Sequence, residues 1–231
     1  MTYVIALLAK AGHGKTTIAK HLEKTYGTRT MSLAGPLKRV AQTVMNFSDA
    51  QIYGTQAEKE AIDPRYGFSA RTFLQRLGTD GLRREFGSDV HVNALLRDIA
   101  RISNRRDPNV PDTTPTAFVV DDARFANEVE AIVAPRDPCG KVIGACIKIV
   151  CTDAPAPAGD MATHPSEMGI DHVPSELISA TLVSSRALGV DHLVGEFEKA
   201  LNTNLYLGLL AKRLRGGARK DEGVEASVWE D

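Results

Sequence analysis

A glycine-containing segment near the N-terminus combines the residue types that bind phosphate groups. From Ala9 to Thr16 the chain runs Ala-Lys-Ala-Gly-His-Gly-Lys-Thr, close to the G-x-x-x-x-G-K-[S/T] pattern of a phosphate-binding loop. In such a loop, backbone N–H groups and the N-terminus of the next helix hold the phosphates of a nucleoside triphosphate. Lys15 would reach the β- and γ-phosphates, and the Thr16 hydroxyl would bind Mg²⁺. The expected ATP-binding residues are Ala11, Gly12, His13, Gly14, Lys15, Thr16 and Thr17.

The loop departs from the usual pattern at Ala9, where the first glycine would stand. Alanine fits this position if its φ angle is negative, because only a positive φ favours glycine. The alternative interpretation is a glycine-containing turn that merely precedes a helix. The apolar run Val4–Leu8 before the loop and the helical pattern Thr17–Leu22 after it favour the phosphate loop. The ring of His13 is expected to point to solvent.

A stripe of polar side chains forms a second candidate site. A helix that starts at Ser69 would carry Arg71, Gln75, Thr79 and Arg83 along one polar arc. Guanidinium groups bind phosphate oxygens through two parallel hydrogen bonds and stay charged at any working pH. Beside a triphosphate loop, the stripe favours a clamp for a second, acceptor phosphate. A solvated charged face is the alternative interpretation.

Two aspartates stand at the end of the strand-like run Ala117–Asp121. Asp121 is the last residue of the run, and Asp122 follows it. Ligands of an open parallel sheet bind at the carboxyl ends of its strands, so Asp121 and Asp122 would face the nucleotide. One carboxylate, taken to be Asp122 although Asp121 stays open, would hold the Mg²⁺ hydration shell, and Arg124 would contact a phosphate. The alternative is that the pair caps the following helix, which contains Asn127–Val133.

The elements that position these residues alternate along the chain. Five strand-like runs are separated by helical segments, which predicts an α/β fold with a five-stranded parallel sheet and helices on both faces. The runs are Tyr3–Leu8, Arg29–Leu33, Ala117–Asp121, Val142–Val150 and Ala180–Ser184.

Further helices are expected after Pro36 as far as Phe47, from Ser69 to Arg84, and from Asp89 to Ser103. The polar stretch Ser48–Gly67 has few strong core residues and is expected to cap the site. Asn104–Pro115 contains several prolines and predicts a loop.

Composition limits the function classes. The 231 residues are 43% hydrophobic and 25% charged, with a formal net charge of −1, as in an ordinary soluble protein without a global attraction to nucleic acid or membrane. Cys139, Cys146 and Cys151 form no C-x-x-C pair, which favours ordinary thiols in a reducing compartment. No apolar run approaches the roughly 20 residues of a membrane span. We therefore expect a cytoplasmic protein.

Several blocks behind the phosphate loop give the chain a family resemblance over about residues 3–203. It resembles the phage deoxynucleoside monophosphate kinases of the P-loop kinase superfamily. The blocks are Ser32-Leu33-Ala34-Gly35-Pro36-Leu37-Lys38, Arg71 with Leu77-Gly78-Thr79-Asp80 and Arg83, Val120-Asp121-Asp122-Ala123-Arg124-Phe125-Ala126-Asn127-Glu128, and His164-Pro165-Ser166-Glu167.

The resemblance implies a kinase core that moves the γ-phosphoryl group of ATP to a deoxynucleoside 5′-monophosphate with Mg²⁺, often as a dimer. It places Lys38 near the acceptor phosphate and Ser166 or Glu167 near the acceptor base or sugar. The family usually has aspartate where this chain has Gly35, and this change bears on substrate range. It also usually has glycine in place of Ala9 and proline in place of Ala70 and Ala126.

The expected organisation is a kinase domain over 1–203, with an acceptor-binding insertion at about 35–105 and a lid at about 151–170. The stretch Thr152–Thr163 is rich in Pro, Ala and Gly, which favours a mobile lid. Residues 204–231 would form a helix and a charged tail whose basic and acidic blocks remain solvated or pair with each other rather than bind nucleic acid. The apolar stripe before the tail is instead suited to a subunit interface, so a homodimer is possible.

Two other functions use the same phosphate loop. One is a P-loop kinase that acts on a hydroxymethylated base in phage DNA, which would need a long basic groove. The other is a nucleotide-gated binding module without turnover, which would tolerate loss of the acceptor arginines. The His164–Glu167 block does not indicate a serine hydrolase, because no nucleophile turn and no third orienting group are visible.

Overall fold

The computed structural model describes residues 2–10, 12–103, 117–134, 142–154, 168–204, 207–208 and 211–212. The chain divides into two compact units. One comprises Met1–Met31 and Ile99–Asp231 and is called the sheet unit below. The other comprises Ser32–Asp98 and is called the insert unit. Each unit contains a buried hydrophobic cluster of its own.

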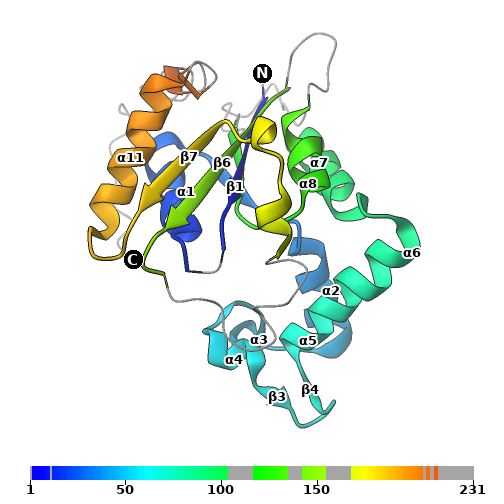
Figure 1. The fold of residues 1–231 in the computed structure, drawn as a ribbon. Coiled ribbons are helices and arrows are strands. Elements are labelled where there is room, and N and C mark those ends of the chain that lie inside the picture. Colours follow the sequence, from blue (N-terminus) through cyan, green and yellow to red (C-terminus); the bar gives the residue numbers. More distant parts are fainter. Residues whose placement is uncertain are drawn as a thin grey trace, which may run out of the picture. The chain divides into compact units, whose positions relative to one another are not determined.

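The sheet unit is built on five parallel strands in the order β2-β5-β1-β6-β7 (Figure 1). The predicted α/β class and five-stranded parallel sheet are confirmed. Two strands are shorter than expected at their carboxyl ends, because β2 stops at Met31 and β5 at Val120. The strands are β1 (Thr2–Leu8), β2 (Arg29–Met31), β5 (Ala117–Val120), β6 (Val142–Cys151) and β7 (Ala180–Ser184).

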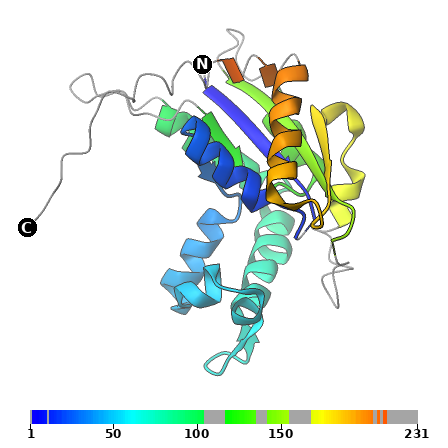
Figure 2. The same ribbon diagram turned by 90° about the vertical axis from the view of Figure 1, so that its left-hand side faces the viewer.

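Alternation along β1 buries its side chains on both faces of the sheet. Tyr3, Ile5 and Leu7 belong to the cluster that also contains buried residues of α1 (Lys15–Tyr26) and α11 (Gly189–Thr203). Figure 2 shows these two helices covering the same face. The register pairs Val4 with Gly144, on the opposite face.

The helix α8 (Ala126–Val133) packs on the face that Gly144 shares. A Cβ atom on Gly144 would come within 1.8 Å of the carbonyl oxygen of Ile132, so the end of α8 approaches the strand at a distance that only glycine permits. Val129 and Ile132 are fully buried there. Helices therefore cover both faces, as predicted.

The two helices of the other face are joined by contacts of a half-buried carboxylate. Glu198 of α11 accepts hydrogen bonds from the hydroxyl of Tyr26 at 2.8 Å, and the Nε2 atom of His21 lies 2.8 Å from its Oε1. Both partners come from α1. Gly27 ends this helix at φ 61, and its N–H reaches the Glu23 carbonyl at 3.1 Å.

The insert unit consists mainly of short helices and a two-stranded sheet of β3 and β4. Its central helix is continuous from α5 through η1 to α6. The elements are α2 (Gly35–Met45), α3 (Asp49–Tyr53), α4 (Gln56–Glu60), β3 (Ile62–Asp63), β4 (Phe68–Ser69), α5 (Ala70–Gln75), η1 (Arg76–Arg83) and α6 (Arg84–Phe86). The helix α7 (Val90–Ser103) runs across the boundary between the units.

The stretch 48–67 contributes one buried hydrophobic residue, Ile52, which agrees with the expectation of few strong core residues. Ile52 is buried with Phe47 in a cluster against which Tyr66, Phe68 and Phe73 pack. The rings of Phe68 and Phe73 stack, and Phe47 meets Tyr66 edge-on. Polar residues dominate the stretch because aromatic rings from its ends supply the core.

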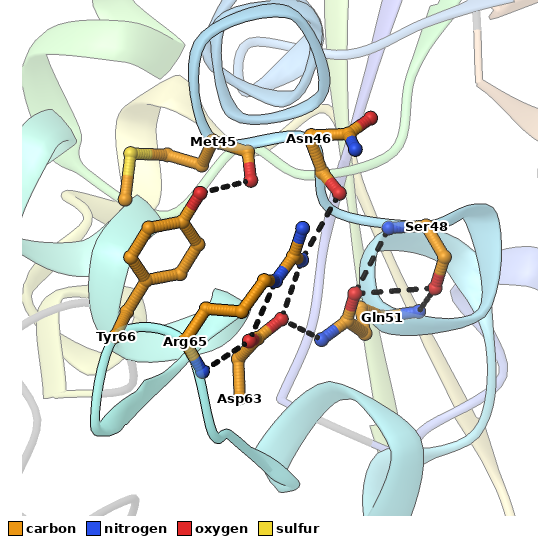
Figure 3. Close-up of polar contacts among 7 residues, drawn as sticks. All are labelled: Met45, Asn46, Ser48, Gln51, Asp63, Arg65 and Tyr66. Carbon is orange, nitrogen blue, oxygen red and sulfur yellow. Dashed lines mark hydrogen bonds and ion pairs between the residues drawn. The ribbon is translucent and has the colours of Figure 1, made fainter.

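A buried carboxylate anchors the β3–β4 turn (Figure 3). Asp63 accepts hydrogen bonds from Nε and Nη2 of Arg65 at 2.9 and 2.7 Å and from Nε2 of Gln51 at 2.9 Å. Arg65 also donates to the carbonyl of Asn46 at 3.1 Å, and Tyr66 donates to that of Met45 at 2.8 Å. The turn is thereby tied to the end of α2. The Arg65 side-chain hydrogen bonds, followed by that of Gln51, hold the pKa of Asp63 well below its usual range.

The expected regular helix over 69–84 is interrupted by a π-helical stretch, η1. Gly78 lies inside it, buried so closely that a Cβ would come within 3.0 Å of Leu37. Nε2 of His91 donates to the Gly78 carbonyl at 3.0 Å. An external donor thus satisfies a carbonyl of this stretch, where the hydrogen bonding departs from the α-helical pattern.

The remaining described elements are two short 3-10 turns, η2 (Gly169–His172) and η3 (Ser175–Leu177). Among the described residues, no helix has both the length and the apolar character needed to cross a bilayer. The predicted loop Asn104–Pro115 and the predicted charged tail lie outside the described residues, apart from a few positions between 204 and 212.

Asp63→Asn is expected to destabilise the insert unit, because an amide cannot accept all the hydrogen bonds that Arg65 and Gln51 donate. The pKa of Asp63 is lowered in the folded state, so its stabilising contribution is complete above the ordinary aspartate pKa of about 3.9 and declines as the pH falls below it. Melting temperatures of the two proteins should differ most near pH 7 and converge in acid. Asp80→Asn, at an exposed position of η1, is the control. A constant difference across pH would contradict the assignment.

Candidate functional site

The phosphate loop joins β1 to α1 in the expected place. Gly12 and Gly14 have φ angles of 78° and 95°, values that favour glycine. Among the described residues, Asn46 is the one non-glycine residue with positive φ, so the condition under which Ala9 replaces glycine is met. Ala9 is buried, and Ala11 lies outside the described residues.

The side chain of Lys15 folds back over its own loop. Its Nζ donates to the carbonyl of Lys10 at 3.0 Å and also to that of Ala9. Both carbonyls lie in the loop that would receive the phosphates. Thr16 and Thr17 follow in the first turn of α1, with Thr16 exposed. The ammonium group is therefore held at the loop and can exchange carbonyl oxygens for phosphate oxygens.

The expectation that the His13 ring points to solvent is wrong. Its Nδ1 accepts a hydrogen bond of 3.1 Å from the backbone N–H of Cys151, at the end of β6. A backbone amide can only donate, so Nδ1 is unprotonated in this contact and Nε2 carries the proton of the neutral ring. The imidazole ties the loop to a neighbouring strand. Sequence gave no signal for this contact, because the partner is a backbone group 138 positions away.

Asp121 and Asp122 lie directly after β5, which pairs with β1 so that Ala6 is opposite Val120. Parallel pairing brings the carboxyl ends of these strands to one edge, so the aspartates and the phosphate loop share that edge. The alternative role as helix caps is wrong, because α8 begins at Ala126 with Phe125 as the preceding residue.

The start of α8 is capped instead by Glu128, which is 3% exposed. Its Oε2 accepts the N–H groups of Arg124 at 2.8 Å and Phe125 at 3.1 Å. A buried carboxylate thus fixes the backbone of Arg124. A glutamate in the first turn of a helix, in position to bond back to the preceding N–H groups, is the sequence signal that indicates this role.

The turn η2, which is distant in sequence from the phosphate loop, also packs at this edge of the sheet. Asp171 of η2 forms an ion pair of 2.6 Å with Lys10 of the phosphate loop. A Cβ on Gly169 would come within 2.8 Å of the Arg124 carbonyl, so η2 contacts the Arg124 segment closely. Ser166, Glu167 and positions 155–163 of the predicted lid lie outside the described residues.

In the insert unit, basic side chains from α2, α4 and α5 gather. Burial, together with the charges of Lys38 and Arg71, lowers the pKa of Lys59. The Lys38 ammonium lies 5.0 Å from the ring centre of Tyr53, and Nη1 of Arg71 lies 3.6 Å from Glu60. Mutual repulsion among cations makes such a group suited to an anion. Lys59 was missed because sequence spacing does not connect α4 with α2.

The predicted arginine stripe occupies the continuous helix from α5 to α6. In an α-helix each four-residue step would rotate a side chain by about 40° away from the previous one, and this spacing does not hold in the π-helical stretch that contains Thr79 and Arg83. Arg71 and Arg83 are separated by about three turns of the continuous helix. Nη1 of Arg83 donates to the carbonyl of Ser88 at 3.1 Å. The two guanidinium groups therefore lie at opposite ends of the stripe.

The donor set at the sheet edge fits a magnesium ion held chiefly by substrate. No group of three or more His, Cys, Asp and Glu side chains that could hold a metal occurs among the described residues. Mg²⁺ commonly takes one or two protein oxygens and completes its shell with phosphates and water. The Thr16 hydroxyl and the Asp122 carboxylate are oxygen donors of that kind.

The thiols contribute no metal ligand cluster to the described structure. Cys146 lies within β6, and burial raises the pKa of its thiol to about 12. Cys151, at the end of the same strand, donates from its sulfur to Asp153 at 3.2 Å. Both are free thiols, and Cys139 lies outside the described residues.

Comparison with known proteins agrees with this arrangement. No protein-family model matches the chain. Over 179 residues it is 34% identical to a protein of Acanthamoeba polyphaga mimivirus named "Putative deoxynucleotide monophosphate kinase". The match covers 74% of this chain and 84% of that protein. With a phosphate loop at the carboxyl edge of a parallel sheet, the chain belongs to the deoxynucleotide monophosphate kinase family, a family of nucleotide kinases.

Proposed function

We propose that the protein transfers the γ-phosphoryl group of ATP to a deoxynucleoside 5′-monophosphate and releases the diphosphate. In a phage, this activity would supply deoxynucleoside triphosphate synthesis. The observation that carries the proposal is the phosphate loop beside Asp121 and Asp122 at one edge of the sheet, in a chain that resembles a named deoxynucleotide monophosphate kinase. Phosphoryl transfer needs positioning and charge neutralisation more than covalent help from the protein.

On the donor side, the loop N–H groups and Lys15 would bind the β- and γ-phosphates. Lys15 would exchange the carbonyls of Ala9 and Lys10 for phosphate oxygens. Thr16 and Asp122 would hold Mg²⁺, which neutralises charge on the phosphates when bound.

On the acceptor side, the proposed contacts are Lys38, Arg71, Gln75, Thr79, Arg83 and Arg124, and the backbone of Arg124 is fixed by Glu128. The basic group around Lys59 supports an anion near Lys38 and Arg71. We assign the acceptor phosphate to the group of Lys38, Lys59 and Arg71. Arg83, at the other end of the stripe, would make a separate contact with the acceptor. Ser166 and Glu167 remain proposed contacts of the acceptor base or sugar, within a lid that closes over both substrates.

A coupled assay of nucleoside diphosphate formation, across the four deoxynucleoside monophosphates, tests the proposal. Transfer to at least one of them, with dependence on ATP and Mg²⁺, is expected. DNA containing hydroxymethyluracil is measured in parallel, because its phosphorylation would indicate a kinase of modified bases instead. ATP binding without transfer to any acceptor would support a binding module.

Lys15→Ala is expected to reduce kcat by at least about 100-fold while the protein stays folded, because it removes a preorganised charge from the migrating phosphoryl group. Lys20→Ala, at an exposed position of the same helix, is the control and should retain activity. Steady-state rates and melting curves of both variants provide the check. Near-normal kcat in folded Lys15→Ala would remove Lys15 from the donor site.

Arg71→Ala and Arg83→Ala should each lower kcat/KM for the acceptor about 10- to 100-fold, as expected for loss of a charged hydrogen bond. The affinity for ATP alone should change far less. Arg84→Ala provides a matched control on the same helix, because its side chain is 79% exposed. Equal losses for ATP and acceptor would place these arginines on the donor side.

His13→Asn and His13→Gln form a matched pair. The asparagine Oδ1 replaces Nδ1 and can accept from the Cys151 N–H, whereas the glutamine amide extends to the position of Nε2. His13→Asn should therefore keep the KM for ATP, and His13→Gln should raise it about fivefold, as for loss of one hydrogen bond. If both variants behave alike in ATP titrations, the contact with Cys151 does not position the loop.

A further inference from the structure

A second cationic side chain lies against the phosphate loop. Arg186 follows β7, the strand beside β6 in the sheet. A Cβ atom placed on Gly12 would come within 2.9 Å of Nη2 of Arg186. The guanidinium therefore occupies the space that a side chain at position 12 would fill. Glycine suits position 12 for two reasons. Its φ angle is positive, and the absence of a side chain leaves room for the guanidinium.

Asp153 fixes the backbone that carries Arg186. Its Oδ1 accepts the Arg186 N–H at 2.6 Å, and its Oδ2 accepts the Ala187 N–H at 3.1 Å. Asp153 stands just after β6, so its carboxylate joins the ends of two neighbouring strands. The backbone bond to Arg186, together with the Cys151 thiol and the Ala187 N–H, holds the pKa of Asp153 below its usual range. The anchor therefore stays charged at neutral pH.

The guanidinium of Arg186 has no carboxylate partner within the described part of the chain. Asp153 bonds to the backbone of Arg186, whereas Asp171 pairs with Lys10. The arginine is exposed, so a bound nucleotide can reach it. Two cationic groups at one loop, Lys15 and Arg186, favour an anion there, and the planar guanidinium suits phosphate oxygens in particular.

We infer that Arg186 binds the triphosphate of the donor nucleotide, as a contact from the β7–α11 connection in addition to those of Lys15 and the loop N–H groups. The inference rests on the proposed function, because it requires a triphosphate at this loop. The contact recognises phosphate rather than the base. Asp153 acts as a positioning residue, because its carboxylate holds the backbone N–H of Arg186.

The test measures binding without acceptor, by calorimetry with ATP and with inorganic tripolyphosphate, which has the phosphates of ATP but no base or sugar. Arg186→Ala should weaken both ligands about 10- to 100-fold, as for loss of a charged hydrogen bond. Arg186→Lys should bind with intermediate affinity, because it keeps the charge and loses the fork. Arg29→Ala, an exposed arginine at the opposite end of the sheet's strands, should bind both ligands normally.

Unchanged affinities in Arg186→Ala overturn the inference, and so does a loss for ATP without a loss for tripolyphosphate, which would indicate contact with the base or sugar. Melting curves confirm that each variant is folded. If Arg186→Ala unfolds, Arg186→Lys decides, because wild-type affinity for both ligands in that variant contradicts the intermediate affinity expected when the guanidinium fork is lost. A wild-type protein that binds ATP but phosphorylates no deoxynucleotide overturns the proposed function alone.

Discussion

The parallel pairing of β1 with β5 and β6 is the interaction on which the donor site depends. Backbone hydrogen bonds set the register, which places the ends of these strands at a common edge. The phosphate loop, Asp121–Asp122 and Asp153 follow these strands in turn. Because every strand of the sheet runs in the same direction, residues that are more than a hundred positions apart meet at this edge, and contacts such as that between His13 and the Cys151 N–H join them there.

Around this edge, carboxylates repeatedly fix backbone groups that lie beside cationic side chains. Glu128 binds the N–H of Arg124, and Asp153 binds that of Arg186. A carboxylate used in this way orders the backbone next to the cationic side chain. At Arg186, a direct ion pair with Asp153 would instead neutralise the cation before a phosphate arrives, so the backbone contact preserves positive potential where a triphosphate would bind.

The insert unit orders the polar stretch 48–67, which has few aliphatic core residues. Aromatic rings and the Asp63–Arg65–Gln51 hydrogen bonds provide its stability. The π-helical stretch is a second local device. Gly78 permits close packing with Leu37, and His91 satisfies the Gly78 carbonyl. These contacts support the helix that carries the proposed acceptor residues, and π-helical stretches occur often at functional sites.

The sequence alone determined the class of fold, the five strands and the phosphate loop. Strand-length apolar runs and the glycine-lysine-threonine spacing are local signals, and each depends on neighbouring residues. The Ala9 exception depended on the sign of one backbone angle, which the structure supplied. The resemblance to deoxynucleoside monophosphate kinases rested on short ordered blocks, and the similarity to the mimivirus protein agrees with it.

The contacts that join distant segments follow from the packing of the elements and have no signal in the local sequence. His13 meets the N–H of Cys151, Arg186 reaches Gly12, and Lys59 lies within the electrostatic reach of Lys38 and Arg71. The helical period assumed for Arg71–Arg83 failed for the same reason, since Gly78 is held by Leu37 and His91 from other elements. Periodicity describes a side chain relative to its own element. The partner across space is set by how elements pack, and that depends on the whole chain.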